Sequence, residues 1–337
     1  MARALRLGLV GCGAVVARRY AQLIAARTDV ALRAVCTRSE PSARAGADRL
    51  GAPIATTDLV RLLGSGEVDA VVIASPHPFH AAQAIRALDA GVHVLVEKPL
   101  ATTLTDAEAV RTAAARSRAV CLPLPHVPSG LIRAARAHLA SDAFGRLVAA
   151  TADFSGPGPA ADQAWKFDAA RAGGGILHAH AVYALDLVAR LGGPASLLVA
   201  LGNTLQAVRR DRAGAAVKSD IIDNAVVSLV QEGGRLASVR TNWSLGAPRQ
   251  HVRFEGTRGA LVYDAGTLYA EDGEGRRAIP TGPPEDVLDA FVGRIQTGLT
   301  DEAGLARAVH VVEQASAAEA VIRAGGGVAR LTTRFDP

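Results

Sequence analysis

Apolar runs alternate with helical patterns through the first third of the chain. Predominantly apolar stretches, which are typical of strands buried on both faces, occupy residues 5–10, 31–36, 68–74, 93–96 and 120–122. Patterns with the helical period lie between them, at residues 15–27, 41–50, 81–90 and 105–116. Because parallel strands need crossover helices, this alternation predicts a doubly wound parallel sheet.

The pattern changes after residue 122, where Pro123, Pro125 and Pro128 indicate a passage between domains. Alternating apolar and polar positions then predict strands at residues 147–153, 197–201, 224–231, 236–243, 251–255 and 259–263. Helical patterns occur at residues 130–140, 174–191 and 303–324. We therefore predict an α/β protein in which residues 1–122 form the parallel sheet and residues 123–337 form an α+β domain with a large, mainly antiparallel sheet.

Composition agrees with two globular domains. The chain has 337 residues, of which 49% are hydrophobic and 20% charged, so each domain can bury a core. Aromatic residues make up only 4%, so Ala, Val and Leu must fill those cores. The formal charge of +5 favours an anionic cofactor or substrate. No basic run is interleaved with aromatic residues, and we expect no nucleic-acid partner.

Cysteine usage and the N-terminal pattern indicate the compartment. Cys12, Cys36 and Cys121 are odd in number and widely spaced, which fits neither a disulfide framework nor a zinc site. The chain enters an apolar strand almost at once, with no signal-peptide pattern, and no apolar run reaches membrane-spanning length. We therefore predict a cytoplasmic protein with reduced thiols and no membrane association.

A glycine turn, Gly11-Cys12-Gly13, separates the first predicted strand from the first predicted helix. Gly11 permits a tight turn and Gly13 permits close approach of a pyrophosphate, while Ala14 and Val15 begin a helix whose free N–H groups face an anion. This context favours a dinucleotide-binding Rossmann domain over a glycine turn without a nucleotide. Val16 stands where Gly or Ala usually packs the helix against the strand, and we expect the helix to be displaced slightly.

The end of the second predicted strand bears on the choice between NAD and NADP. An NAD site commonly has an acidic residue there, but the sequence reads Thr37-Arg38-Ser39 and has no carboxylate before Glu40. Arg38 can pair with a 2′-phosphate, which favours NADP slightly. The alternative is a solvated Arg38 and a less selective NAD site.

Two further segments resemble a known family. Ser75-Pro76-His77-Pro78-Phe79-His80 follows the third predicted strand of this domain, and Glu97-Lys98-Pro99 follows the fourth. Together with Trp165-Lys166, the triple glycine at residues 173–175 and a helix that ends in Asp186, they resemble the Gfo/Idh/MocA oxidoreductases over essentially the whole chain. Glu97-Lys98-Pro99 is the most specific of these motifs. The resemblance implies that Ser75, His77, His80 and Glu97 lie on the cofactor side of the site.

Lys98 has the chemistry that carbinol oxidation requires. A proton must leave oxygen as hydride leaves carbon, and a lysine at a strand's carboxyl end can hydrogen-bond that oxygen. Partial burial and neighbouring positive charge would lower its pKa into the working range. Glu97 would orient Lys98 or the nicotinamide side of the site. The alternative is a surface lysine paired with its neighbour.

The second block departs from the family pattern. Alignment on the triple glycine puts Ala179 where the family usually has Asp, and Tyr183 where it usually has His. Tyr at this place resembles the branch that contains glucose–fructose oxidoreductase and dihydrodiol dehydrogenases, where the phenol is an acid or base. His180 lies three residues before Tyr183, on the same side of a helix, and could replace the missing polar group. A half-buried aromatic without a catalytic role is the alternative for Tyr183.

The substrate pocket is expected to be unusual. Pro125 and His126 replace an Arg and an aromatic residue that often border the substrate in the family. Trp165 could stack on a sugar ring and Lys166 could bind a hydroxyl or phosphate, although Trp165 fits a core equally well. Ala179 would face the same pocket. We expect no metal, because His178 and His180 do not share a helix face.

These observations predict an NAD(P)-dependent oxidoreductase that acts on a secondary alcohol or ketone. The substrate would be a sugar, nucleotide sugar, cyclitol or aminoglycoside-type molecule, with a role in making a secondary metabolite such as an antibiotic. An NAD-dependent glycosidase of the same family, a non-catalytic dinucleotide sensor and a purely structural α/β protein are the alternatives. By analogy with the family, the protein would be a homo-oligomer, either a dimer or a tetramer.

Overall fold

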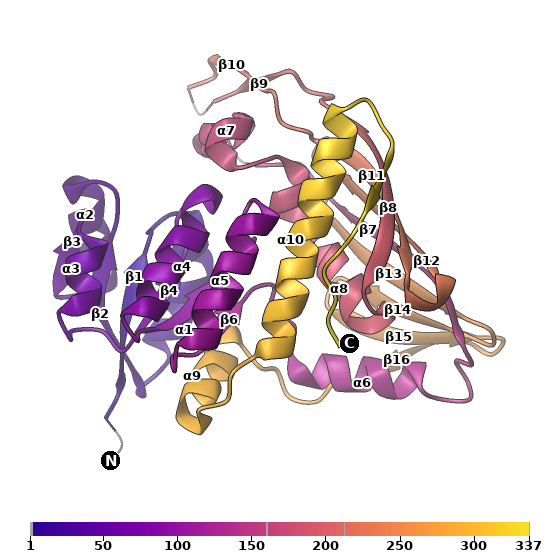
Figure 1. Cartoon of the computed structure of the whole chain (residues 1–337), viewed down its shortest axis with the longest axis horizontal. Helices are drawn as coiled ribbons and strands as arrows, with labels where there is room; N and C mark the ends of the chain where they lie inside the picture. Colours follow the sequence, from indigo (N-terminus) through magenta and orange to yellow (C-terminus); the bar gives the residue numbers. More distant parts are fainter. Residues whose placement is uncertain (1–2, 160, 212, 337) are drawn as a thin grey trace. The chain divides into compact units, whose positions relative to one another are not determined.

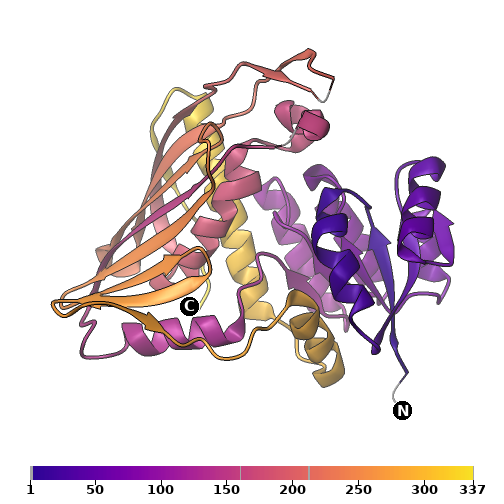
Figure 2. The ribbon, with the colours of Figure 1, turned by 180° about the vertical axis from the view of Figure 1, so that it is seen from behind.

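The computed structural model describes residues 3–159, 161–211 and 213–336. Its contacts divide the chain into two compact units (Figures 1 and 2). The first contains the chain up to His126 together with Asp286–Leu305, and the second contains Val127–Glu285 and the residues from Ala306 onward. The predicted second domain, residues 123–337, includes Asp286–Leu305, whereas the contacts of the structure place this segment in the first unit.

A six-stranded parallel sheet forms the centre of the first unit, in the order β3-β2-β1-β4-β5-β6. Its strands are β1 (Leu5–Val10), β2 (Val30–Cys36), β3 (Ile54–Thr56), β4 (Ala70–Ile73), β5 (His93–Val96) and β6 (Cys121–Pro123). Every adjacent pair is parallel. All four residues of β4 are buried, as expected for a strand covered on both faces. The predicted doubly wound parallel sheet is thereby confirmed.

Helices cover both faces of this sheet. The first unit contains η1 (Val16–Tyr20), α1 (Ala21–Ala25), α2 (Glu40–Leu50), α3 (Leu59–Gly64), η2 (His77–Phe79), α4 (His80–Asp89), α5 (Leu104–Arg116) and α9 (Val287–Thr297). Helix α9 places Val287, Leu288, Phe291 and Val292 in the same core as β1 and β2. Helix α9 therefore belongs to the first unit, although it follows most of the second unit in the sequence.

The second unit is built on a nine-stranded sheet in the order β16-β15-β14-β13-β7-β12-β11-β8-β17. Its strands are β7 (Leu147–Ser155), β8 (Ala195–Asn203), β11 (Asn224–Gln231), β12 (Leu236–Asn242), β13 (Arg249–Gly256), β14 (Ala260–Asp264), β15 (Thr267–Asp272), β16 (Gly275–Ile279) and β17 (Val328–Arg330). Only the pairing of β7 with β12 is parallel among those described. The sheet is thus mainly antiparallel, as predicted.

One face of the large sheet is packed and the other is open. Along β11, Ala225, Val227 and Leu229 are buried while Val226 and Ser228 are exposed, which is the period of a half-buried strand. The buried face shares a core with α8 (Val182–Gly192) and α10 (Glu302–Arg323), which begins in the first unit. The unit also contains α6 (Ser129–Leu139), η3 (Ala161–Phe167), α7 (Ala169–Ala172), η4 (Leu177–Ala181) and η5 (Glu232–Gly234).

A small hairpin stands apart from the large sheet. Strands β9 (Val208–Arg210) and β10 (Ala216–Lys218) form a separate two-stranded sheet, seen at the top of the second unit in Figure 1. No helix in the part of the chain that the structure describes is long and apolar enough to cross a membrane.

Candidate functional site

The cofactor candidates of the first unit meet at one edge of its sheet. Parallel strands end at the same edge, and β2, β1, β4 and β5 are consecutive neighbours in the sheet. The loops that follow these strands therefore lie in a row. They carry, in that order, Thr37 and Arg38; Gly11, Gly13, Ala14 and Val15; Ser75 and His77; and Glu97 and Lys98. A ligand bound outside the carboxyl ends of the strands would face all of these loops.

The glycine loop has the geometry that a dinucleotide requires. Gly11 has φ +93°, and a Cβ there would lie 2.6 Å from the carbonyl oxygen of Ala74, so only glycine fits. A Cβ at Gly13 would meet nothing within 4 Å, which leaves its backbone open to a ligand. These features fit a bound pyrophosphate. Val16 is fully buried, and the turn that it begins is a π-helix rather than an α-helix.

The segment after β2 presents hydroxyl and guanidinium groups to solvent. Arg38 and Ser39 are exposed, and the hydroxyl of Thr37 donates to the carbonyl oxygen of Ser39 at 3.0 Å. From α2, the guanidinium of Arg49 donates to the carbonyl oxygen of Cys12 in the glycine loop at 3.2 Å. Positive charge therefore accompanies this end of the candidate cofactor site, and Arg49 was not singled out from the sequence.

A buried carboxylate network lies at the end of β5. Glu97 is 4% exposed, and its Oε1 atom accepts hydrogen bonds from Tyr20 and Arg19, each at 3.0 Å. Its Oε2 atom accepts the backbone N–H of Lys98 at 3.2 Å. Burial, followed by the charge of Glu97, raises the pKa of Tyr20, which therefore stays protonated as a donor. The network fixes the start of the turn that carries Lys98.

Lys98 has the ionisation behaviour of a group that exchanges protons near neutrality. Burial lowers its pKa to about 8, assisted by the charges of Arg19 and Arg18 and opposed by Glu97. A perturbed lysine at the carboxyl edge of a parallel sheet is a functional-site candidate. The sequence identified Lys98 and Glu97, but Arg19 and Tyr20 emerge only once the fold brings η1 beside the end of β5.

The histidines that follow β4 are buried rather than open. His77 is 8% exposed and His80 1% exposed. The two ring nitrogens of His80 each lie 2.7 Å from a main-chain oxygen, one of Pro99 and the other of Ser75. The hydroxyl of Ser75 donates to Gln83 at 2.6 Å. His80 thus contacts main chain on both sides of its ring, and its cofactor contact remains a prediction.

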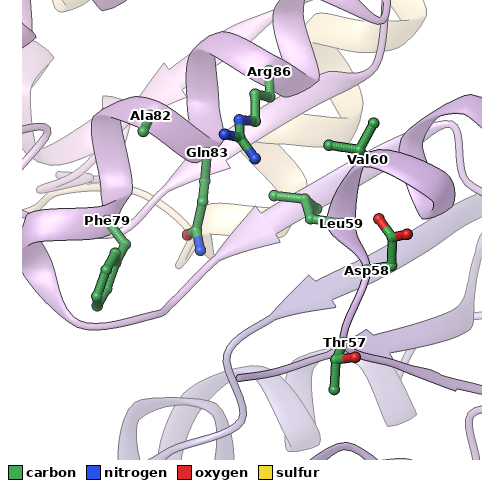
Figure 3. A pocket seen from close by; sticks show the side chains of 8 residues that line it. All are labelled: Thr57, Asp58, Leu59, Val60, Phe79, Ala82, Gln83 and Arg86. Atoms are coloured by element: carbon green, nitrogen blue, oxygen red, sulfur yellow. The ribbon is translucent and has the colours of Figure 1, made fainter. Parts of the chain in front are cut away.

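A cavity of about 410 Å³ opens between the segment after β3 and helix α4. Figure 3 shows Gln83 and Arg86 projecting from α4 toward the segment that carries Asp58 and Leu59. The carboxylate of Asp58 accepts the backbone N–H of Arg61 and caps α3. The full lining is Thr57, Asp58, Leu59, Val60, Phe79, Ala82, Gln83 and Arg86. Apolar and polar side chains therefore line the cavity together, as is usual for a small-molecule site.

Tyr183 and His180 are neighbours in the second unit. Their ring centroids are 6.3 Å apart and nearly perpendicular. Phe154 of β7 stacks beside Tyr183 with centroids 6.4 Å apart and planes 13° from parallel, and it meets His180 edge-on at 6.4 Å. The expectation that His180 shares a side of the helix with Tyr183 agrees with this geometry.

The helix that carries these residues begins with a π-helical segment, Leu177–Ala181, before α8. Ala179 lies on it and is partly exposed. His178 is 1% exposed and its Nε2 atom lies 3.1 Å from a carboxylate oxygen of Glu319 on α10, which supports a structural role. Asp186, near the end of the same motif, forms buried ion pairs with Arg190 and Arg307.

The remaining substrate candidates lie in two places. Trp165 and Lys166 are on η3, partly exposed, with the Lys166 ammonium 5.5 Å from the centroid of the Trp165 ring. His126 is partly exposed and is the last residue of the N-terminal stretch of the first unit. Among the described residues, no group of three or more His, Cys, Asp or Glu is arranged to hold a metal ion.

Two family profiles match the chain. Residues 5–123 match an oxidoreductase family with an NAD-binding Rossmann fold, and residues 132–262 match the GFO/IDH/MocA C-terminal domain. The chain belongs to the Gfo/Idh/MocA oxidoreductase family. The resemblance drawn from the sequence is thereby confirmed, and the chain is an oxidoreductase with a nicotinamide-cofactor domain.

Several characterised members are similar over much of their length. The 1,5-anhydro-D-fructose reductase of Ensifer adhaerens is 27% identical over 94% of this chain and 97% of its own. A dTDP-3,4-didehydro-2,6-dideoxy-α-D-glucose 3-reductase of Streptomyces violaceoruber is 36% identical over 56% of this chain and 55% of its own. Among solved structures, GenD2 from gentamicin A biosynthesis in complex with NAD has a TM-score of 0.81 at 25% identity, and covers 99% of this chain and 98% of its own.

Levoglucosan dehydrogenase in complex with NADH and levoglucosan shares the fold, with a TM-score of 0.84 at 20% identity over 98% of this chain and all of its own.

Proposed function

We propose that this family member oxidises or reduces a secondary alcohol or ketone of a sugar-like substrate. Its characterised relatives are named as reductases and dehydrogenases of sugars and nucleotide sugars. The single observation that carries the proposal is Lys98, a lysine whose pKa burial lowers to about 8 at the carboxyl edge of a dinucleotide-type sheet.

Lys98 and Tyr183 would manage the proton on the substrate oxygen. A nicotinamide cofactor, when bound, supplies the hydride chemistry. Neutral Lys98 accepts the proton of the alcohol during oxidation, and protonated Lys98 returns it during reduction. The phenol of Tyr183 is a second donor and acceptor, and His180, 6.3 Å away between ring centroids, takes the polar place that Ala179 leaves empty. Glu97 holds the backbone N–H of Lys98 and so orients its turn.

The cofactor proposal is NAD or NADP, with NADP favoured. Exposed Arg38 and Ser39 follow β2 without a carboxylate, which supports recognition of a 2′-phosphate. The cavity bordered by Leu59, Phe79 and Arg86 lies at the carboxyl edge of the sheet, and we assign it to the adenine end of the cofactor.

Substrate recognition would rest on Trp165, Lys166 and His126. An indole stacks on the apolar face of a sugar ring, and an ammonium binds hydroxyl or phosphate oxygens. The nucleotide-sugar reductases and GenD2 among its relatives support a nucleotide sugar or aminoglycoside-type substrate, and a role in antibiotic biosynthesis.

Self-association would use the open face of the large sheet. Leu201 of β8 is 65% exposed and lies opposite Val226 of β11, while Val199 lies opposite Val328 of β17, which is 63% exposed. A contiguous apolar patch on a sheet face is typical of an interface, so we propose a homodimer or homotetramer. The three cysteines are unpaired, which supports a cytoplasmic location.

The deciding experiment is a titration with NAD, NADH, NADP and NADPH, followed by a panel of sugars and nucleotide sugars read at the reduced-nicotinamide absorbance. Lys98→Met should retain the cofactor affinity and lose turnover by about 10²–10⁴-fold, the usual contribution of a general acid or base. Unchanged turnover in that variant would remove Lys98 from the reaction. Cleavage of glycosides without net cofactor turnover would support a glycosidase, and cofactor binding without turnover on any sugar would support a sensor.

A further inference from the structure

The imidazole of His80 is enclosed between two hydrogen-bond acceptors. Its Nδ1 atom lies 2.7 Å from the carbonyl oxygen of Pro99 and its Nε2 atom lies 2.7 Å from that of Ser75. A carbonyl oxygen only accepts, so each of these contacts requires an N–H on the ring. A neutral imidazole has one N–H and one lone pair, and therefore satisfies only one of them.

We propose that His80 is an imidazolium at neutral pH and a positioning residue for Lys98. In a neutral ring, the nitrogen without hydrogen would direct its lone pair at an oxygen 2.7 Å away. The side chain is 1% exposed, so solvent offers little replacement for the lost partner. With both nitrogens protonated, the same geometry gives two short, charge-assisted hydrogen bonds.

The surroundings of His80 affect its pKa in both directions. Burial favours the neutral ring and lowers the pKa of His80, and the charge of Lys98 acts the same way. The carbonyl oxygens of Pro99 and Ser75 and the carboxylate of Glu97 act in the opposite direction. The ring of His77 meets that of His80 edge-on, with centroids 5.8 Å apart. The cation is retained because, in a neutral ring, an unprotonated nitrogen would face a carbonyl oxygen with no hydrogen between them. A buried histidine that faces only one acceptor does not meet this repulsion.

The position of His80 connects two parts of the candidate site. Ser75 follows β4 and Pro99 follows Lys98 after β5, so the ring ties the ends of two neighbouring strands together. The charge has a second effect. Since Lys98 disfavours the proton on His80, a proton on His80 must disfavour the proton on Lys98 by the same coupling free energy. A charged His80 therefore favours the neutral form of Lys98, an inference that rests on the proposed role of Lys98.

The protonation state can be read directly by ¹⁵N NMR of the full chain labelled at histidine, between pH 6.5 and 8.5. Two other histidines are internal references. In His93, Nδ1 accepts the backbone N–H of Val120 at 2.9 Å, and in His310, Nε2 accepts that of Ala195 at 3.0 Å, so both rings are neutral but in opposite tautomers. The signals that disappear in His80→Gln should show both ring nitrogens protonated throughout this range. One unprotonated nitrogen at pH 7 would overturn the charged state.

Two measurements keep the test decisive. If His80→Gln does not fold, the ring is assigned in the unmodified protein from nuclear Overhauser contacts to Ser75 and Pro99. In folded His80→Gln, the midpoint of the kcat/KM rise with pH should move above the value near 8 set by Lys98, whereas a loss of packing alone would lower activity at every pH without moving it. An unmoved midpoint would overturn the positioning role. If Lys98→Met keeps full turnover while the His80 spectrum is that of an imidazolium, the role of Lys98 fails and the charge on His80 stands.

Discussion

At the scale of single residues, the position of a side chain relative to the parallel sheet determines its ionisation. Lys98 is one of two lysines or arginines in the stretch from residue 93 to residue 111, and burial at the end of β5 lowers its pKa against the opposing charge of Glu97. Tyr20 and Arg19 complete that network from η1, more than seventy residues earlier in the chain. A sequence motif reveals Glu97 and Lys98 because they are adjacent, but it cannot reveal partners that only folding brings together.

The pH dependence of the reaction follows from Lys98. Its folded pKa is lowered from 10.5 to about 8, so the neutral form, which accepts the substrate proton, predominates only above that pH. In the oxidation direction, kcat/KM should rise about tenfold per pH unit below 8 and become level above it. In the reduction direction, the rate should fall above pH 8. A rise that continued toward pH 10.5 would show that Lys98 behaves as an ordinary surface lysine.

Tyr183→Phe separates the catalytic role of this tyrosine from a packing role. The ring keeps its stacking against Phe154, so the free energy of unfolding should change little. Loss of the hydroxyl should lower kcat by about 10²–10⁴-fold, with a smaller change in KM. Steady-state kinetics beside a urea denaturation curve measure both quantities. A wild-type kcat in Tyr183→Phe would show that Tyr183 is a half-buried aromatic residue without a catalytic role.

At the scale of elements, a hydrophobic period is visible in the sequence only where one face is buried. Strands β1 and β11 were predicted at their observed bounds because their apolar patterns are strong. Strand β16 was missed because four of its five residues are exposed and it includes Arg276 and Arg277, so it has no apolar face. Helix α9 was not predicted, although Asp286 and Asp289 form a capping box in its first turn.

The hairpin of β9 and β10 is held by one buried ion pair. The carboxylate of Asp223 accepts from Arg209 at 2.7 Å and also from the backbone N–H groups of Leu205 and Gln206. The guanidinium of Arg209 lies 5.1 Å from the ring centroid of Phe167, which ends η3 beside Trp165 and Lys166. The ion pair therefore couples the hairpin to the segment that carries two substrate candidates.

Asp223→Asn should destabilise the second unit, because it leaves the buried Arg209 without its counter-charge. Removing one partner of a buried ion pair costs about 3–5 kcal/mol. Urea denaturation should show an earlier midpoint, and KM for the substrate should rise while cofactor affinity stays constant. Asp142→Asn is the matched control, since Asp142 pairs with Arg258 on the surface and should change stability by less than about 0.5 kcal/mol. Equal stability of the two variants would contradict a structural role for the pair.

At the scale of the whole molecule, alternation predicted both sheets correctly, but not which strands are neighbours. The order β13-β7-β12 places β7 between strands that follow it by about a hundred residues, and nothing in the local pattern of β7 encodes these pairings. The two units and the family were inferable because each has a distinct period and its own motifs. The π-helical segment that carries Ala179 was not inferable, since the helical pattern at residues 174–191 gives no sign of it.

The open face of the large sheet gives a prediction about assembly. Leu201→Glu combined with Val226→Glu places two adjacent charges on the apolar patch, and we expect the oligomer to dissociate to a species of half the mass or less in light scattering. Leu299→Glu is the control, because Leu299 is 62% exposed in the first unit and lies outside the patch. An unchanged mass in the double variant would locate the interface elsewhere.

The chain returns to the first unit at Asp286, and this affects how the protein folds during synthesis. The strands of the parallel sheet are translated before Val127–Glu285, but Phe291 and Val292, which complete the core of that sheet, are translated after it. At about 5–20 residues per second, the nascent sheet waits on the order of ten seconds with that apolar surface uncovered. Residues 3–126 released alone would therefore aggregate unless a chaperone bound them. A chain in which a short Gly-Ser linker joins His126 to Asp286 would contain the helix that covers this apolar surface, and we expect it to fold unaided.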